Sequence, residues 1–299
     1  MKKILPQLAI IFAAILWSFD GLLRQALYSV PSLIIVTIEH IIGAVLFIPF
    51  ILKARKEIKT INQQTWVSVF WISICGGILG TFFYTSALSY VHYINLSVVV
   101  LLQKLQPLFA ISLASVILKE KLSKKFLFLA SLAITGSFLV TFGLQPLSQW
   151  EDKMIIASLF ALLAAFSWGS STVLGKHALK KLSFQIVTSL RLIITSVTCL
   201  FIVIGTQDLH IIVDLTKFQW LSIFIISIST GSIALFIYYY GLKNTPASHA
   251  TLYELFWPLS AMFIDWFYRS RTLEAAQFIG AILLLSSIIL LSRDNNELS

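Results

Sequence analysis

Residues 94–118 read INLSVVVLLQKLQPLFAISLASVIL, an apolar run in which Lys104 is the one charged side chain. A hydrocarbon core of about 30 Å is crossed by about 20 helical residues. Similar runs recur along the whole chain of 299 residues, which is 58% hydrophobic and 12% charged, whereas a soluble protein is typically about 25% charged. The composition therefore predicts an integral membrane protein without a soluble domain.

Turns and charged residues divide these runs into ten predicted transmembrane helices. An all-α fold is expected, because open sheet edges are not stable in lipid and the runs are too long and too uniformly apolar for the strands of a membrane barrel. The predicted helices cover residues 5–23, 32–52, 66–90, 94–118, 124–143, 154–175, 184–205, 218–242, 246–268 and 273–292.

The distribution of the 22 lysines and arginines predicts the orientation in the membrane. If the N-terminus is cytoplasmic, fifteen of them lie in cytoplasmic loops and tails and five lie outside, which is the usual bias of membrane proteins. Both termini are therefore predicted to be cytoplasmic, with the protein in the inner (plasma) membrane. The same bias explains the net charge of +9, so no nucleic-acid partner is expected. The two remaining basic residues, Lys104 and Arg191, fall inside predicted helices.

The two halves of the chain resemble each other. A tryptophan followed by a small residue lies in the first predicted helix of each half, at Trp17 and Trp168. Matching Pro107 with Pro258 aligns SALSYVHYINLSVVVLLQKLQPLFA with YGLKNTPASHATLYELFWPLSA, with three extra residues in the first segment. The halves are residues 1–147 and 148–299, each with five predicted helices. An odd number of helices places the two copies in opposite orientations, as in many secondary transporters whose binding sites lie between the repeats.

Several motifs occur in the order and spacing of a known family. They are Trp17-Ser18 and Trp168-Gly169, Ala87-Leu88-Ser89-Tyr90, Pro107 and Pro258, and the basic-Glu-basic turn Lys119-Glu120-Lys121-Leu122. With these motifs the sequence resembles the EamA type of the drug/metabolite transporter superfamily over nearly its whole length. The resemblance implies a ten-helix carrier that moves a small organic solute by alternating access. The second half departs from the pattern, because Arg271 matches Glu120 and Gly241-Leu242-Lys243-Asn244 replaces the alanine-leucine-tyrosine motif.

Charged side chains deep in the membrane are the main candidates for function. A charge at the bilayer centre costs at least about 3 kcal/mol, so it tends to face a cavity or a partner. Lys104 is predicted to lie about 15 Å deep and Glu254 about 12 Å deep, at a rise of 1.5 Å per residue. The alignment places Glu254 opposite Gln103, and Pro258 is expected to free a backbone carbonyl one turn earlier. Either these groups face a solute in a hydrated central cavity, or they form a structural ion pair.

Other candidates follow from depth and chemistry. Asp20 could pair with Lys104 or Arg24, a histidine beside a glutamate could carry a coupling proton, and aromatic rings beside a carboxylate could hold an organic cation. The predicted solute contacts are Lys104, Glu254, Gln103, Tyr253, Trp257, Trp17 and Trp168. The residues predicted to act in gating or proton coupling are Asp20, Glu39, His40 and Arg191.

The pattern of candidate residues favours a transporter over an enzyme. Neither a nucleophile with its base nor a metal cluster can be identified in the predicted helices, and Cys75 and Cys199 have no ligand spacing, so no cofactor is expected. A lysine, a glutamate and rings at one level suit a zwitterionic solute, such as an amino acid or a related amine-bearing metabolite. The alternatives are an exporter of organic cations, in which Glu254 matters and Lys104 does not, and a membrane scaffold subunit. The spacing of Gly76 and Gly80 predicts close helix packing.

Overall fold

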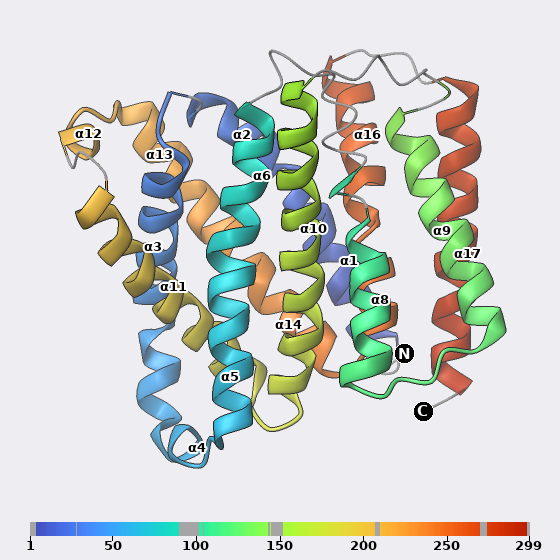
Figure 1. Cartoon of the computed structure of the whole chain (residues 1–299), viewed down its shortest axis with the longest axis horizontal. Helices are drawn as coiled ribbons and strands as arrows, with labels where there is room; N and C mark the ends of the chain where they lie inside the picture. The colour runs from blue at the N-terminus through green and yellow to red at the C-terminus, as the bar shows by residue number, and fades with distance from the viewer. Residues whose placement is uncertain are drawn as a thin grey trace.

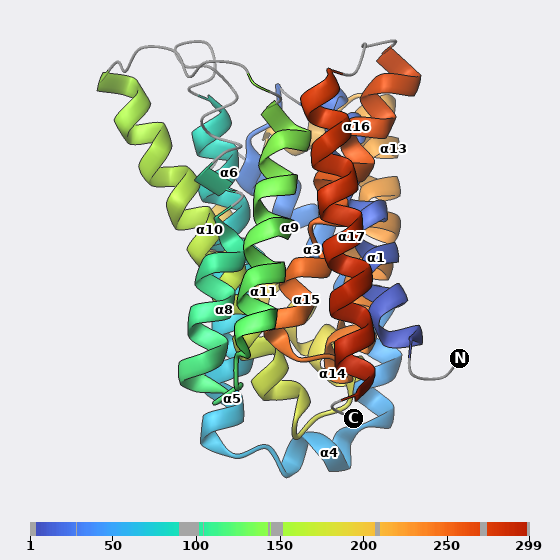
Figure 2. The ribbon, with the colours of Figure 1, turned by 90° about the vertical axis from the view of Figure 1, so that its right-hand side faces the viewer.

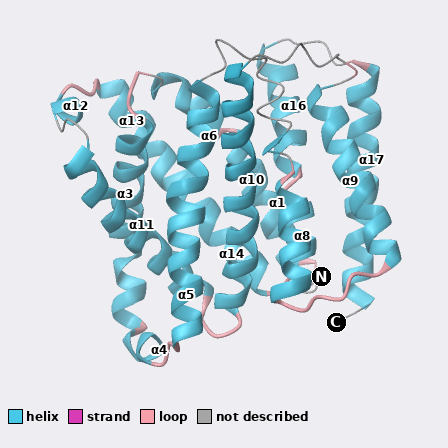
Figure 3. Ribbon diagram, viewed as in Figure 1, coloured by secondary structure: helices cyan, strands magenta, loops and turns pink. Residues whose placement is uncertain are grey.

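The computed structural model describes residues 4–27, 29–89, 102–103, 105–142, 144, 152–206, 210–269 and 274–297. In this part of the chain every regular element is a helix (Figure 3). The long helices run side by side in one bundle (Figure 1). The start of α1 and the end of α17 lie at the same end of the bundle (Figure 2).

Residues 5–142 form the first series of helices. The α5 helix begins after Asn62, whose side-chain oxygen accepts the Thr65 N–H at 2.9 Å and so caps the first turn. The elements are α1 (Leu5–Ser18), α2 (Asp20–Leu23), the 3₁₀ turn η1 (Arg24–Leu27), α3 (Ser32–Lys53), α4 (Arg55–Lys59), α5 (Gln63–Trp71), the π-helical segment η2 (Ile72–Leu79), α6 (Gly80–Ser89), α8 (Gln106–Ile117) and α9 (Lys124–Phe142).

Residues 152–297 form the second series. The α13 helix begins with a capping box, in which Thr216 and Gln219 each bond the backbone of the other. The elements are α10 (Asp152–Leu179), α11 (Phe184–Thr206), α12 (His210–Val213), α13 (Lys217–Ile226), the π-helical segment η3 (Ser227–Ile233), α14 (Ala234–Lys243), α15 (Ala247–Tyr253), α16 (Phe256–Arg269) and α17 (Ala275–Glu297).

Helices cover most of the described part of every predicted segment, but some bounds differ, and Phe19 separates α1 from α2 within the predicted helix 5–23. The α10 helix extends to Leu179, beyond the predicted end at 175. The predicted helix 246–268 is broken at Glu254 and Leu255, between α15 and α16. Residues 90–101 and Lys104 lie outside the described residues, so the number of ten membrane helices stays a prediction.

Five helical stretches of the described chain are long and apolar enough to cross a membrane, by length and composition. Large apolar side chains on the bundle surface are exposed, among them Val116 at 74% and Phe201 at 73%, as expected for contact with lipid rather than water. The five stretches are Ser32–Lys53, Gln63–Tyr84, Ile156–Leu179, Phe184–Thr206 and Lys217–Lys243.

Small residues let the helices approach closely, as predicted for Gly76 and Gly80. A Cβ atom on Gly76 would lie 2.1 Å from the Ser171 hydroxyl, and one on Gly80 would lie 2.4 Å from Trp168 Nε1. Helices α9 and α17 pack against each other along the side of the bundle (Figure 2). They approach each other closely at Gly136 and Gly280.

We expect Gly280→Val to destabilise the protein. A Cβ on Gly280 would lie 2.7 Å from the Gly136 carbonyl oxygen on the facing helix, and overpacking of this kind costs about 1–3 kcal/mol. The midpoint of thermal unfolding in detergent should fall. The matched control is Gly205→Val in α11, where a Cβ would meet no atom within 4 Å. Equal midpoints for the two variants would contradict the close crossing of α9 and α17.

Candidate functional site

The carboxylate of Glu254 lies at the break between α15 and α16 and is held by three other helices. Its Oε2 accepts a hydrogen bond from Gln106 Nε2 at 2.8 Å, and Gln106 is the first residue of α8. Its Oε1 accepts from the Tyr238 hydroxyl of α14 at 2.6 Å and from Thr172 Oγ1 of α10 at 3.3 Å. The two hydroxyls also contact each other, at 2.9 Å. The break in the helix thus places a carboxylate where both halves of the chain supply donors.

All of these donors are uncharged. In the part of the chain that the structure describes, no lysine or arginine nitrogen lies within 4.0 Å of Glu254. Hydrogen bonds to an ionised acceptor are about twice as strong as neutral ones. Three of them therefore stabilise the ionised carboxylate of Glu254, whereas lipid offers it no hydrogen-bond donor. Lys104, the predicted partner, lies outside the described residues.

Gln103, which the alignment of the halves places opposite Glu254, extends this network. Its Nε2 donates to Gln106 Oε1 at 3.3 Å, which leaves Gln103 two hydrogen bonds away from Glu254. Its own Oε1 is buried and has no hydrogen-bond partner among the residues that the structure describes. The prediction that Pro258 frees a backbone carbonyl one turn earlier is wrong for Glu254. The Glu254 carbonyl oxygen accepts the Trp257 N–H at 3.0 Å in the turn between α15 and α16.

Two tryptophan–tyrosine pairs lie at corresponding positions of the two halves. Trp17 of α1 packs on Tyr238 with ring centroids 5.3 Å apart, and Trp168 of α10 packs on Tyr84 of α6 at 5.5 Å. Both pairs are tilted by 53°. Trp17 therefore reaches Glu254 through Tyr238. Tyr253 is fully buried, and its hydroxyl has no hydrogen-bond partner in the described part of the chain.

Arg191, predicted to act in gating or proton coupling, lies beside this cluster. Its Nη1 donates to the Tyr239 hydroxyl at 2.8 Å, and the ring of Tyr239 lies 5.6 Å from that of Tyr238. A Cβ atom on Gly76 would lie 3.0 Å from Arg191 Nη2, so the glycine leaves room for the guanidinium. The Nε atom of Arg191 is buried, and no described residue bonds it. A line of groups therefore runs from the carboxylate of Glu254 through two tyrosines to a cation.

A second charged cluster lies at the end of the bundle opposite to the chain termini (Figure 1). Asp20 pairs with Arg24, one of the two partners considered for it from the sequence. The Nη2 atom of Arg24 lies 3.0 Å from Glu39 Oε2. Asp20 also accepts a hydrogen bond from Thr230 Oγ1 of η3 at 2.8 Å. These contacts join α2, η1, α3 and η3. Glu39 pairs with Arg24 in this cluster, whereas Arg191 bonds Tyr239 beside Glu254.

The remaining candidates take part in local contacts. His40 Nδ1 donates to the Val36 carbonyl at 2.8 Å within α3, and Trp257 is partly buried at the start of α16.

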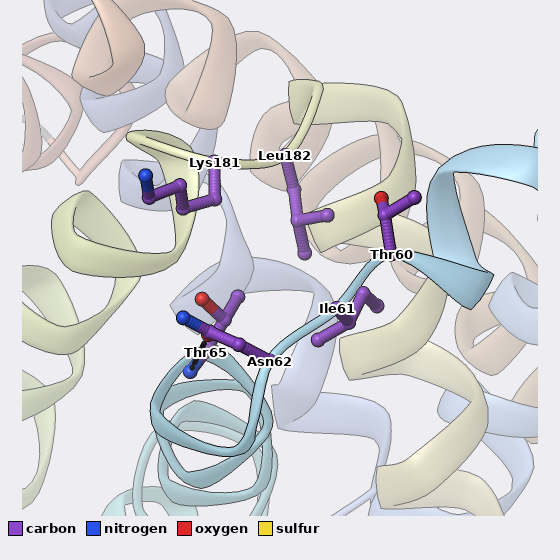
Figure 4. A pocket seen from close by; sticks show the side chains of 6 residues that line it. All are labelled: Thr60, Ile61, Asn62, Thr65, Lys181 and Leu182. Carbon is purple, nitrogen blue, oxygen red and sulfur yellow. Dashed lines mark hydrogen bonds between the residues drawn. The ribbon is translucent and has the colours of Figure 1, made fainter.

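A pocket of about 190 Å³ lies at the end of the bundle that carries α4, and it shares no residue with the Glu254 cluster (Figure 4). The described residues contain no group of three or more potential metal ligands. The pocket is lined by Thr60, Ile61, Asn62, Thr65, Lys181 and Leu182.

The neutral donors to Glu254 were not predicted from the sequence. Gln106 stands two residues after Lys104 and one before Pro107, yet it is neither charged nor unusual in a membrane helix. Thr172 and Tyr238 carry no hydropathy signal that separates them from packing residues. The depth of Glu254 was the usable signal, because a membrane carboxylate requires donors at its own level.

Comparison with known proteins agrees with this architecture. Residues 5–142 and 155–293 each match the EamA-like transporter family. The chain is 40% identical over 291 residues to the riboflavin transporter ImpX of Fusobacterium nucleatum, covering 96% of this chain and 97% of that protein. It is 24% identical over 282 residues to Protein LicB of Haemophilus influenzae, covering 93% of this chain and 94% of that one. A solved crystal structure with 19% identity superposes with a TM-score of 0.75 over 95% of this chain and 96% of that chain, which shows a shared fold.

A bundle of apolar helices around hydrogen-bonded charges is typical of a helical membrane transport protein. The chain belongs to the EamA-like transporter family, within the drug/metabolite transporters.

We expect Arg24→Met to destabilise the protein, because it leaves Asp20 and the 7%-exposed Glu39 without their cation. Breaking a buried ion pair costs about 3–5 kcal/mol, and the 30% exposure of the Arg24 side chain lowers this to roughly 2–4 kcal/mol. Adding Glu39→Gln to Arg24→Met should restore part of the loss, since the uncompensated charge is removed. The measurement is thermal unfolding of the three purified variants. A double variant that is less stable than Arg24→Met would show that the cluster is not held by this pairing.

Proposed function

We propose that the protein carries riboflavin or a closely related flavin across the membrane. The observation that carries this proposal is the 40% identity to a riboflavin transporter over nearly the full length of both chains. Flavin transport is stated of that relative, and the chemistry of the Glu254 cluster supports extending it to this chain. No step of chemical conversion is part of the proposed function.

The isoalloxazine ring of riboflavin is flat and uncharged, with an N–H between two carbonyls on one edge and a chain of hydroxyls on the ring system. Glu254 is proposed to accept the N–H or a ribityl hydroxyl, while the amide of Gln106 or the cation of Arg191 donates to a carbonyl. The pairs Trp17–Tyr238 and Trp168–Tyr84 offer aromatic faces for stacking. A few placed polar groups among aromatic ones are typical of sites for such ligands.

A zwitterionic amino acid, the expectation from the sequence, is not supported. It was based on Lys104 and Glu254 as opposite charges at one level, but the described partners of Glu254 are neutral donors. The full-length relative named for riboflavin also speaks for a larger, aromatic solute. Tyr253, Trp257 and Lys104 remain proposed contacts of the solute.

We propose that the chain has ten membrane helices in two inverted repeats, residues 1–147 and 148–299, and moves its solute by alternating access. Mirrored contacts support this arrangement. A Cβ on Gly43 of α3 would lie 2.6 Å from Ser232 in η3, and one on Gly77 in η2 would lie 2.3 Å from Thr195 of α11. Each half therefore packs its second helix against the π-helical segment of the other half. The proposed location is the inner membrane with both termini in the cytoplasm.

The Arg24 cluster is proposed as a gate on the outer side. Asp20, Arg24 and Glu39 join segments of the first half, and Thr230 adds the second half. Alternating access requires such contacts to break when the outer side opens. His40, which follows Glu39 in the sequence, is the proposed carrier of a coupling proton.

We expect Glu254→Gln and Gln106→Leu each to weaken riboflavin binding by about 10-fold or more, because a hydrogen bond to a charged group contributes about 1.5–3 kcal/mol. Binding is measured with purified protein by quenching of riboflavin fluorescence, and transport by uptake into proteoliposomes. The control is Asp214→Asn, the same carboxylate-to-amide change at an exposed residue after α12, which should leave binding unchanged.

The choice of solutes separates the alternatives. Riboflavin, a mixture of amino acids and the lipophilic cation tetraphenylphosphonium are offered to the same proteoliposomes. Uptake of the cation but not of riboflavin would replace the flavin proposal by cation export. If Glu254→Gln and Gln106→Leu both bind riboflavin as tightly as the wild type, Glu254 is not part of the solute site.

A further inference from the structure

The turn after α8 directs Glu120 toward another helix. The Glu120 N–H donates to the Ala114 carbonyl at 3.2 Å, and the Leu118 N–H donates to the same oxygen at 3.1 Å. Lys119, between them, has a positive φ of 57°, which is unfavourable for a residue with a side chain. A residue in this conformation ends a helix and reverses the chain. Strained backbone of this kind persists where its surroundings fix it, and here the contacts of Glu120 do so.

The Glu120 carboxylate caps the start of α15. Its Oε1 accepts the Ala247 N–H at 2.8 Å, and its Oε2 accepts the Ser248 N–H at 3.1 Å and the Ser248 hydroxyl. The α15 helix has no cap of its own, because Pro246 occupies the N-cap position and makes no side-chain bond. The first N–H groups of a helix need partners, and a negative charge there interacts favourably with the helix dipole. A residue of the first half thus completes a helix of the second.

The α8 and α15 helices are therefore joined at both ends. Gln106, at the start of α8, donates to Glu254, just after the end of α15. Glu120, after the end of α8, caps the start of α15. The α15 helix has 7 residues and is about 10 Å long at a rise of 1.5 Å per residue. Two links this close together leave α15 little freedom to turn or slide against α8, with which it packs.

We propose that Glu120 is a positioning residue for the solute site. By anchoring the start of α15 to the end of α8, it sets the direction in which Glu254 presents its carboxylate to Gln106 and to the solute. Glu120 itself touches no solute. The inference rests on the proposed role of Glu254 as a solute contact.

A purely structural role would be to stabilise α15, and moving the cap separates the two roles. The N-cap residue Pro246 has φ −55° and ψ 144°, in the extended region that suits a capping side chain. Pro246→Asp therefore supplies a cap from the helix's own chain. In the double variant Glu120→Ala/Pro246→Asp, the start of α15 is capped but is no longer tied to α8.

The experiment compares wild type, Glu120→Ala, Pro246→Asp and the double variant. Spin labels are placed at the exposed positions Val116 of α8 and Phe267 of α16, after replacement of both native cysteines by alanine. The thermal midpoint, the distribution of label distances and the affinity for riboflavin are measured. We expect Glu120→Ala to lower the midpoint, broaden the distances and weaken riboflavin binding at least 10-fold. The double variant should regain the midpoint but keep the broad distances and the weak binding, while Pro246→Asp alone should behave as wild type.

The outcomes are separable. Recovery of the narrow distances and the affinity in the double variant would overturn the proposal, because a helix cap alone would then account for Glu120. Unchanged distances and affinity in Glu120→Ala would overturn it as well. If the wild type binds no riboflavin, the proposed function fails, whereas the label distances still decide whether Glu120 holds α16, which follows α15 after the turn at Glu254, in place relative to α8.

Discussion

A carboxylate inside a bundle that faces lipid must receive its hydrogen bonds from the protein, because the hydrocarbon supplies none. Glu254 receives them from Gln106, Thr172 and Tyr238 on α8, α10 and α14. Hydrogen bonds are directional, so this one group requires three helices to keep their relative positions. The site is therefore also a structural constraint on the bundle.

The two ends of the bundle are closed by different kinds of contact. At the end opposite to the chain termini, full charges meet in the cluster of Asp20, Arg24 and Glu39. At the end that carries α4, charged side chains instead bind backbone groups. Glu57 accepts the Ser183 N–H before α11, and Lys176 donates to the carbonyl of Leu242. Backbone partners hold helix ends in place, whereas ion pairs between side chains can separate without unwinding a helix.

Much of the fold could be predicted from the sequence, because apolar runs of membrane length have few other uses. The long unbroken helices α3 and α11 begin and end within about two residues of the predicted bounds, as is usual for helix ends. The break at Glu254 was not predicted, since the motif looked like a continuous helix with one proline. The π-helical segments were not predicted either, because a change of winding leaves the hydropathy of the sequence unchanged.

The candidate site was predictable in its charges and not in its neutral groups. A buried glutamate is rare enough in a membrane helix to be informative by itself. Gln106, Thr172 and Tyr238 become informative only when their distances to Glu254 are known. The role of Arg24 was visible as a possible partner of Asp20, but its second contact, with Glu39, depends on how η1 turns back over α3.

The π-helical segment η3 has a consequence for which side chain meets the carboxylate. It precedes α14 directly, so its winding sets the direction of every side chain on that helix. Wound as an ordinary α-helix, its 7 residues would turn α14 by about one residue, or roughly 100°. Ile237 would then take the direction of Tyr238, and Tyr238 that of Tyr239. The winding of η3, which donates no hydrogen bond to Glu254, thus determines whether the carboxylate faces the phenol of Tyr238 or the hydrocarbon side chain of Ile237.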